Sequence, residues 1–276
     1  MTTPPEPADA ESLVLVEDAG TVRRLVLNRP SKLNAMSGAM VERLSRCLAD
    51  AAADDAVRVV VIAGSGRAFC AGYDLDDPDD THTLAGYLAR LLEVFDMPQP
   101  VIAEVHGYCL AGGCDLMMMC DLAVAADDAV FGQPEIRFGS AVVAMVLPWL
   151  IGARRAKEMV LTGRGDITAA EAERIGLVNR VVPGDELRSA TMDLAGQLAT
   201  VDAVTMRLAK RALNRAWEAA GFRRSLAEAV QIGERIEADH APERDEFERI
   251  RRSEGLQAAI AWRDARFESG HSEGGR

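Results

Sequence analysis

Two short, mainly apolar segments, each following a helical pattern, constrain the fold of this chain most. They are 57–64 (VRVVVIAG) and 100–108 (PVIAEVHGY), and both are rich in the β-branched residues that favour strands. A strand that is apolar on both faces is buried on both faces, which is typical of a parallel sheet covered by helices. The chain is therefore predicted to be an α/β protein in which loops at the strand ends carry the chemistry.

Similar patterns extend through the first half of the sequence. Segment 12–30 predicts two short strands around a turn at 18–20, and segment 36–55 predicts a helix capped by Ser37. The same criteria predict two helices and a strand further along, at 83–96, 115–120 and 122–132. Strands and helices thus alternate, as an α/β fold requires.

The second half of the chain is predicted to be mainly helical. Beyond about residue 153, helical periods are interrupted by one short strand at 177–182, and from Val201 onward only helices are expected. The sequence therefore divides into a flexible tail (1–12), an α/β core (13–200) and a helical region (201–276) that packs on a neighbouring element or on a partner subunit.

Composition excludes several classes of protein. The chain has 276 residues, of which 49% are hydrophobic, enough for one large core. Its net charge of -12, from 43 acidic and 31 basic residues, disfavours nucleic acid and anionic lipid as partners. The first dozen residues lack the features of a secretory signal, and no apolar run approaches the ~20 residues of a membrane-spanning helix. A soluble, cytoplasmic protein is expected.

The five cysteines support the same location. None falls in a C-x-x-C pair, their number is odd, and most have apolar neighbours, which predicts reduced thiols that serve in packing. They are Cys47, Cys70, Cys109, Cys114 and Cys120.

Two glycine-rich turns follow predicted strands, at 61–75 (VIAGSGRAFCAGYDL) and 105–116 (VHGYCLAGGCDL). Neither has the spacing of a nucleotide-binding motif. If both turns face one cleft, each can direct a backbone N–H at the same ligand oxygen and so form an oxyanion hole, reinforced by the helix that starts at the second turn. Ordinary strand-to-helix connections, in which glycine only relieves strain, explain the same residues, and the pattern alone leaves both interpretations open.

Carboxylates near these turns are candidates for acid–base chemistry. Asp115 lies one turn into the helix after the second turn, and Glu135 lies in FGQPEIRFG, where Pro134 and the glycines are expected to keep the backbone out of a helix. A carboxyl group against apolar walls has a raised pKa and can exchange protons near neutral pH. A solvated surface charge remains the alternative for either acid.

Other catalytic arrangements have less support. His106 follows a buried strand and is expected to be packed or hydrogen-bonded rather than a base, and the run 117–119 (MMM) is expected to lie in the core. The four histidines are far apart and no metal-ligand spacing occurs, so no metal site is predicted. The sequence contains no G-x-S-x-G nucleophile motif.

Taken together, four ordered segments resemble the enoyl-CoA hydratase/isomerase, or crotonase, superfamily. The resemblance extends over roughly residues 13 to 270 and is specific. The segments are 27–36 (LNRPSKLNAM), 66–75 (GRAFCAGYDL), 101–139 (VIAEVHGYCLAGGCDLMMMCDLAVAADDAVFGQPEIRFG) and 161–183 (LTGRGDITAAEAERIGLVNRVVP).

The resemblance implies a crotonase-like spiral of ββα units followed by a C-terminal helical oligomerisation region that builds trimers, often paired into hexamers. It also implies an acyl-CoA thioester as the ligand, with no metal or redox cofactor. In the family, the thioester carbonyl lies in an oxyanion hole whose backbone N–H groups correspond to those of Tyr73 and Gly112 here.

The resemblance also assigns the two acids. Hydratases of the family use two glutamates 20 residues apart to hold and activate water, and Asp115 and Glu135 occupy these positions. Asp115 is one methylene shorter than glutamate. Dienoyl-CoA isomerases also carry an aspartate there but pair it with a further acid eight residues beyond the glutamate, where this chain has Val143, so that activity is not favoured. The stretch 139–152 (GSAVVAMVLPWLIG) departs from the usual loop and is expected to alter the acyl pocket.

The expected function is therefore hydration of a 2-enoyl-CoA, or the reverse dehydration, as in fatty acid metabolism. Glu135 is expected to be the general acid/base, and Asp115 to position the water. The alternatives are an enoyl-CoA double-bond isomerase, a decarboxylase or thioester hydrolase that reuses the same oxyanion hole, and a non-catalytic acyl-CoA-binding protein.

Overall fold

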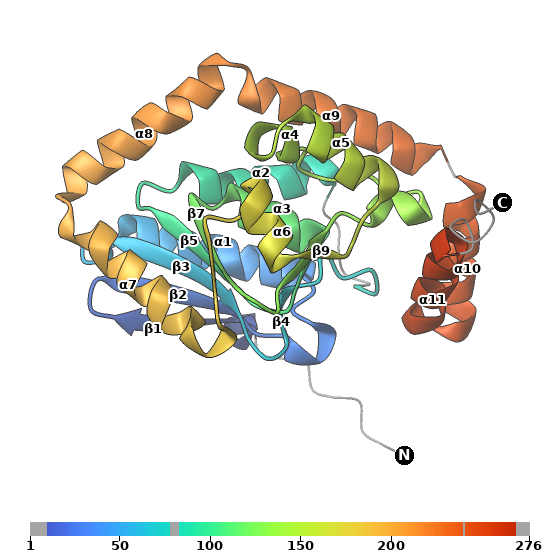
Figure 1. Ribbon diagram of the computed structural model, residues 1–276, viewed down its shortest axis with the longest axis horizontal. Coiled ribbons are helices and arrows are strands. Elements are labelled where there is room, and N and C mark those ends of the chain that lie inside the picture. The colour runs from blue at the N-terminus through green and yellow to red at the C-terminus, as the bar shows by residue number, and fades with distance from the viewer. Residues whose placement is uncertain (1–9, 78–82, 240, 269–276) are drawn as a thin grey trace.

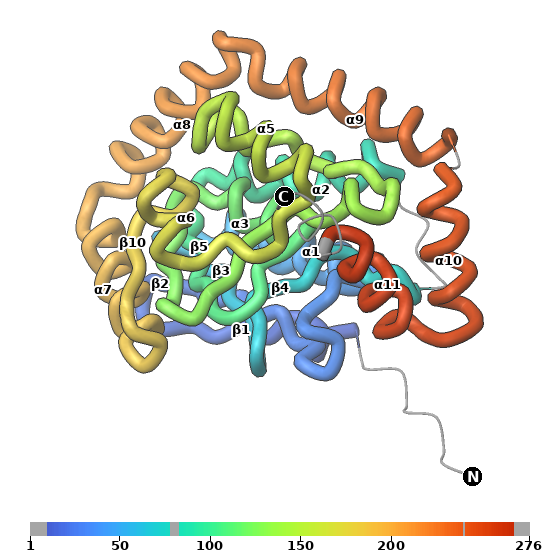
Figure 2. The backbone as a smooth tube through the Cα atoms, turned by 45° about the vertical axis from the view of Figure 1, so that its right-hand side comes forward, coloured from blue at the N-terminus to red at the C-terminus, as the bar shows by residue number. Residues whose placement is uncertain are grey.

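The computed structural model describes residues 10–77, 83–239 and 241–268, and its core contains two sheets (Figure 1, Figure 2). The larger sheet has the strand order β1-β2-β3-β5-β7-β10, and the smaller has the order β4-β6-β8-β9. The strands of the larger sheet are β1 (Val14–Ala19), β2 (Val22–Leu27), β3 (Val59–Gly64), β5 (Val101–Val105), β7 (Leu122–Ala126) and β10 (Arg180–Val182). Those of the smaller sheet are β4 (Ala68–Cys70), β6 (Tyr108–Leu110), β8 (Val130–Gly132) and β9 (Ile167–Thr168).

The chain winds between the two sheets as a spiral. Each of β3, β5 and β7 in the larger sheet is followed at once by β4, β6 or β8 in the smaller sheet, and the pairings within both series are parallel. The spiral of ββα units that the resemblance implied is therefore confirmed. The single strand expected at 122–132 is instead two strands in different sheets, because the chain turns at Asp127 and Asp128, with Ala129 N donating to Ala126 O at 3.1 Å.

In the described part of the chain, seven helices of the spiral connect or cover the sheets. They are α1 (Gly38–Ala53), α2 (Leu84–Asp96), α3 (Gly112–Met119), α4 (Leu147–Leu150), α5 (Ala153–Thr162), α6 (Ala169–Ile175) and α7 (Leu187–Thr200). Ser37 caps α1 as predicted, since its hydroxyl accepts from Met40 N. Short 3₁₀ turns complete the set: η1 (Ala10–Leu13), η2 (Pro30–Lys32), η3 (Glu135–Phe138) and η4 (Gly184–Glu186).

Both faces of the larger sheet are buried, as its apolar strands predict. On one face, α7 lies against the sheet (Figure 1). Its residues Leu187 and Ala195 pack there with side chains of the sheet such as Val59 and Ile102. The main core lies on the other face and contains the buried sides of α1, α2 and α3. Strands β4 and β6 of the smaller sheet contact α3, and the turns that follow these two strands form the candidate site.

The C-terminal helices form an arm around the spiral. As Figure 1 and Figure 2 show, α8 (Ala203–Ala219) and α9 (Phe222–Ala238) arch along the outside, and α10 (Pro242–Glu254) and α11 (Leu256–Glu268) form a hairpin at the far end. The prediction of helices only after Val201 is confirmed for the described residues. Lys210 is the one buried residue of α8.

Two further expectations concern the N-terminal tail and membrane-spanning helices. Residues 10–13 form η1, with Leu13 buried, while the rest of the expected N-terminal tail lies outside the described residues. Within the described ranges, no helix is both long and apolar enough to cross a bilayer.

Candidate active site

The first glycine-rich turn follows β4 and is fixed by pairing with the segment before α1. Met36 N donates to Gly72 O at 2.8 Å, and Asp74 N donates to Met36 O at 2.9 Å. In this parallel bridge, the N–H of Tyr73 lies on the side away from Met36. Gly72 has φ +113°, a conformation that favours glycine, so the turn depends on this residue.

The second turn leads from β6 into α3. Ala111 has φ 52° and ψ -131°, an unfavourable conformation for a residue with a side chain, and its N–H donates to Gly132 O at 2.9 Å. Gly112 is the first residue of α3, so its N–H has no acceptor within the helix. The positive end of the α3 dipole lies at the same point.

The two turns touch. A methyl group placed on Gly112 would come within 2.4 Å of Tyr73 Cε2, and one placed on Gly113 would come within 2.3 Å of Cys70 O. A methyl group on Gly72 would lie 3.5 Å from Gly112 N. The two turns are therefore in contact, and a side chain at Gly113 has no room because backbone atoms of Cys70 occupy its space.

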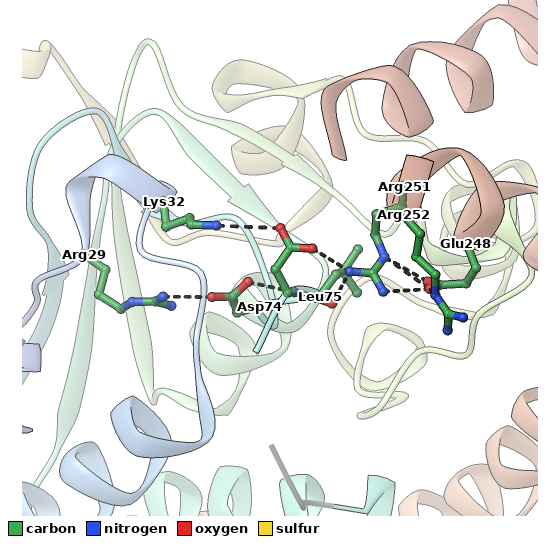
Figure 3. A network of polar contacts seen from close by, with 8 residues as sticks. Arg29, Lys32, Asp74, Leu75, Glu248, Arg251 and Arg252 are labelled. Carbon is green, nitrogen blue, oxygen red and sulfur yellow. Dashed lines mark hydrogen bonds and ion pairs between the residues drawn. The ribbon is translucent and has the colours of Figure 1, made fainter. Parts of the chain in front are cut away.

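Ion pairs also fix the residues that directly follow Tyr73 in the first turn. Asp74, next to Tyr73, pairs with Arg29 at 2.8 Å, and Asp76 pairs with Lys32 at 3.6 Å (Figure 3). Arg251 of α10 contacts the same loop: it donates to Leu75 O at 2.9 Å and also pairs with Asp76. The arm is therefore tied directly to the turn that carries Tyr73.

Asp115 is fully buried one turn into α3. Its Oδ1 accepts from Gln133 Nε2 at 2.8 Å, and its Oδ2 accepts from Ala144 N at 3.2 Å. Burial raises the pKa of Asp115 to about 7, although both hydrogen bonds favour the charged form. This carboxyl group can therefore lose or gain a proton near neutral pH.

Glu135 is also buried, and the two acids interact. Burial raises the pKa of Glu135 well above its usual range, and the nearby Asp115 raises it further. Among the described residues, Glu135 Oε2 has no hydrogen-bond partner. The solvated surface charge considered as the alternative for each acid is therefore excluded in this fold.

The backbone at Glu135 differs from the expectation. Glu135–Phe138 form η3, a single 3₁₀ turn, where a non-helical segment was expected. Pro134, which directly precedes this turn, does not prevent it, because a proline at a helix start has a suitable φ and lacks only an N–H that would have no acceptor there. Gly139, with φ 74°, ends the turn.

Sequence reasoning missed Gln133. This fully buried amide donates to Asp115 from the end of β8, two residues before Glu135. The only signal in the sequence was its place two residues before Glu135. A glutamine between a strand and a turn does not by itself indicate a contact with a buried acid. The loop after η3 also contributes, because Glu237 of α9 accepts from Ser140 Oγ at 2.6 Å and from Ala141 N at 2.8 Å. This anchors the loop whose Ala144 N–H reaches Asp115.

Two weaker candidates have the structural roles that were predicted. His106 Nε2 lies 3.0 Å from Gly66 O, as expected for a hydrogen-bonded histidine, and Met117–Met119 are buried in the core. All five cysteines are free thiols, and burial raises the pKa of Cys70 to about 12. In the part of the chain that the structure describes, no group of His, Cys, Asp and Glu side chains is arranged to hold a metal ion.

The C-terminal hairpin covers the segment that carries Glu135. Both α10 and α11 contact η3, and the ring of Phe138 stacks on that of Phe247 with centroids 4.7 Å apart. Arg263 of α11 partly offsets the raised pKa of Glu135 through its charge. The hairpin therefore limits the access of water to Glu135 from this side.

Comparison with known families gives a match across most of the chain. Residues 17–269 match the model of a family described as enoyl-CoA hydratase/isomerase. A probable enoyl-CoA hydratase of Rhizobium meliloti (strain 1021) is 37% identical over 267 residues, which cover 92% of this chain and 97% of that protein. A mitochondrial enoyl-CoA hydratase of Pongo abelii is 33% identical over 254 residues, with 90% and 83% covered.

Solved structures show the same relationship. The crystal structure of an enoyl-CoA hydratase/isomerase from Xanthobacter autotrophicus Py2 superimposes with a TM-score of 0.86 at 39% identity, covering 92% of this chain and 98% of the other. Sequence and fold therefore point to one family.

Proposed function

The chain belongs to the enoyl-CoA hydratase/isomerase family, and from this premise we propose that it adds water to a 2-enoyl-CoA thioester and catalyses the reverse dehydration. The observation that carries the proposal is the pair of buried, interacting acids, Asp115 and Glu135, beside two touching turns. No metal or redox cofactor is required, because the thioester itself acidifies its α-carbon.

The two turns supply the electrophilic part of the site. In the proposed complex, the N–H groups of Tyr73 and Gly112 donate to the thioester oxygen, which becomes an enolate oxygen when water attacks the β-carbon. The start of α3 at Gly112 supports the developing negative charge. One such donor is typically worth ~3 kcal/mol of barrier.

The two acids divide the proton transfers. Glu135, whose pKa is raised by burial and by Asp115, holds a proton and delivers it to the α-carbon. Asp115, which accepts hydrogen bonds from Gln133 and Ala144, holds the water and takes the proton that it releases. The water oxygen bonds to the β-carbon, and return of the proton from Asp115 to Glu135 resets the site.

Double-bond isomerisation is the second candidate function. It is favoured by one observation: both oxygens of the short Asp115 side chain are already engaged by protein donors. An isomerase needs only Glu135 to carry a proton between the α- and γ-carbons, with the same oxyanion hole. The carboxyl group of Asp115 would then serve mainly to raise the pKa of Glu135.

Two substitutions separate these functions. General acid/base catalysis typically contributes about 10²- to 10⁴-fold, so Glu135→Gln should lower kcat by that factor for either reaction. Asp115→Asn should cause a comparable loss in a hydratase. In an isomerase it should largely spare kcat and mainly shift its pH dependence, because the charge that raises the pKa of Glu135 is removed. The assay follows the absorbance of crotonyl-CoA and longer 2-enoyl-CoA esters for hydration, and the conversion of 3-enoyl-CoA for isomerisation.

Calorimetry with a saturated acyl-CoA tests the non-catalytic alternative. Tight binding without turnover of any enoyl-CoA would contradict both enzymatic proposals and support an acyl-CoA-binding protein. Retention of both buried carboxyl groups supports an enzyme, because a binding protein gains nothing from two acids beside the reacting carbons.

We also propose that the arm forms the subunit contacts of a homotrimer or a dimer of trimers in the cytoplasm. Three large apolar side chains on α8 support this assembly: Val204, Leu208 and Leu213 are 62%, 57% and 73% exposed. Light scattering of Leu213→Glu beside the unchanged protein tests it, and an unchanged mass for this variant would contradict the proposed interface.

A further inference from the structure

The side chain of Tyr73 belongs to an aromatic pair behind the proposed oxyanion hole. Its ring packs against that of Tyr87 in α2, with centroids 3.8 Å apart and 38° between the ring planes. Tyr87 is buried and Tyr73 is half-buried. The pair therefore joins the first turn to α2 at the point where Gly112 begins α3.

A small apolar cavity lies next to this pair. Its volume is about 20 Å³, and besides the two tyrosines it is lined mainly by side chains of α1, α2 and α3, among them Leu48, Leu91 and Leu116. A cavity of this size holds about one water-sized group. In this conformation it has no room for an extended acyl chain.

The cavity is close to the proposed reaction centre. Leu116 follows Asp115 directly in α3, and the Tyr73 ring lies within contact distance of Gly112, whose missing side chain would meet Tyr73 Cε2 at 2.4 Å. An acyl chain that continues past the thioester toward α2 therefore meets the two aromatic rings first. The apolar walls beyond them are suited to methylene groups.

We propose that Tyr73 and Tyr87 close this apolar pocket and restrict the enzyme to short 2-enoyl-CoA esters. The inference rests on the proposed hydratase or isomerase function and names its substrate class. The rings act as a specificity element, because a longer chain can enter only if they separate and lose their mutual packing. The polar side chain of Arg90 at the pocket wall is held by Glu42 and Glu93, so it leaves the interior apolar.

Tyr87→Ala is the variant that tests the proposal, because Tyr87 has no part in the proposed chemistry. The quantity measured is the ratio of kcat/KM for a 2-octenoyl ester to that for crotonyl-CoA. A difference of one methylene in a hydrophobic pocket changes specificity by about 10- to 200-fold, so removal of the ring should raise the ratio at least about tenfold. An unchanged ratio would overturn the proposal.

Two control variants identify the cause of any change in this ratio. Tyr87→Phe keeps the ring and should leave the ratio unchanged, whereas an increase would assign the selection to the hydroxyl group and contradict closure by the rings. Tyr108→Ala removes a tyrosine that does not line the cavity and is 43% exposed. It should also leave the ratio unchanged, and an equal increase there would contradict a local effect.

The unchanged protein provides a test that does not depend on the folding of a variant. Its kcat/KM should fall as the chain lengthens from crotonyl-CoA to decenoyl-CoA, and a flat or rising profile would overturn the proposal. If no enoyl-CoA is turned over, the proposed function fails, and the specificity inference is judged by binding alone. Butyryl-CoA should then bind more tightly than decanoyl-CoA, and the opposite order would reject closure by the tyrosines.

Discussion

The turns that form the candidate site and the C-terminal arm are held in place by different interactions. At the turns, backbone contacts backbone: Gly113 has no space for a side chain because Cys70 O occupies it. The arm is held largely by side chains, such as the pair between Lys210 and Asp121 at 2.6 Å and the stacked rings of Phe138 and Phe247. Its hairpin has a small core of its own around Phe247, Ile250 and Ala259.

This difference indicates that the turns and the arm have different roles. Backbone contacts without intervening side chains cannot adjust, so they preserve the positions of the N–H groups of Tyr73 and Gly112. Side-chain contacts can be lost singly at modest cost, and helices held in this way can open locally more easily than the core. Substitutions at the turns should therefore abolish activity, whereas those in the arm should mainly change stability or access to the site.

Gly113→Ala should have the largest effect. The added methyl group would lie 2.3 Å from Cys70 O and 2.8 Å from Cys70 C, and backbone atoms cannot move aside as a flexible side chain can. Overpacking of this kind costs about 1–3 kcal/mol, and a displacement of about 1 Å at a reacting centre can cost about 10²-fold in rate. Both losses should appear, in urea denaturation and in kcat.

Gly196→Ala is the matched control, because Gly196 also lies within a helix, α7, but a methyl group there meets no atom within 4 Å. Alanine should stabilise that helix by about 0.5–1 kcal/mol and leave kcat unchanged. If Gly113→Ala behaved like this control, the turns would be adjustable and the comparison with the arm would fail.

Asp115→Asn should change the pH dependence of stability. Burial raises the pKa of Asp115 from 3.8 to about 7 in the folded chain, so the fold favours its protonated form. Stability from this group is fully present below about pH 4 and is lost as pH rises through 7. At about 1.36 kcal/mol per pKa unit, the loss approaches about 4 kcal/mol as an upper limit.

The asparagine variant cannot ionise, so its free energy of unfolding should fall less than that of the unchanged protein between pH 4 and 8. Urea denaturation at several pH values measures this slope. Asp55→Asn is the control, because that side chain is 99% exposed, and it should retain the slope of the unchanged protein. An unchanged slope in Asp115→Asn would show that the site is more hydrated than the buried geometry implies.

The sequence predicted the scaffold well because its signals are local. Apolar strands such as 59–64 were recognisable from composition, and Ser37 is a standard helix cap. The split of 122–132 into β7 and β8 was missed because both halves are apolar and nothing in the pattern showed that they enter different sheets. A strand's partner is determined by the rest of the fold.

The site was predictable only in part. The spacing of Asp115 and Glu135 came from the family resemblance, and their assigned catalytic roles stay predictions until they are measured. Burial of both acids depends on contacts far apart in the chain: Ala144 lies 29 residues from Asp115, and its hydrogen bond depends on a loop held by α9. The contact of Gln133 with Asp115 and the packing of Tyr73 on Tyr87 likewise depend on segments that meet only in the fold.

Arg251→Gln should have a smaller effect than Gly113→Ala or Asp115→Asn. It tests how the arm is held against the loop after the first turn. The side chain is 17% exposed and joins α10 to Asp76 and Leu75 O while also pairing with Glu248 (Figure 3). Its loss should destabilise the docked hairpin by about 1 kcal/mol, the usual scale for partly exposed pairs. Hydrogen exchange in α10 and α11 should accelerate severalfold, and kcat should stay nearly unchanged.

Arg249→Gln in the same helix separates docking from helix stability. Arg249 is 58% exposed, and among the described residues it pairs only with Glu246, in the same helix. Exposed pairs of this kind contribute little to stability, so exchange in α11 should hardly change. If both variants accelerated exchange equally, the contact with the loop at Asp76 would not hold the hairpin. If Arg251→Gln instead lowered kcat as strongly as Gly113→Ala, the arm would belong to the same rigid unit as the turns, because loss of a side-chain contact would then displace the reacting groups.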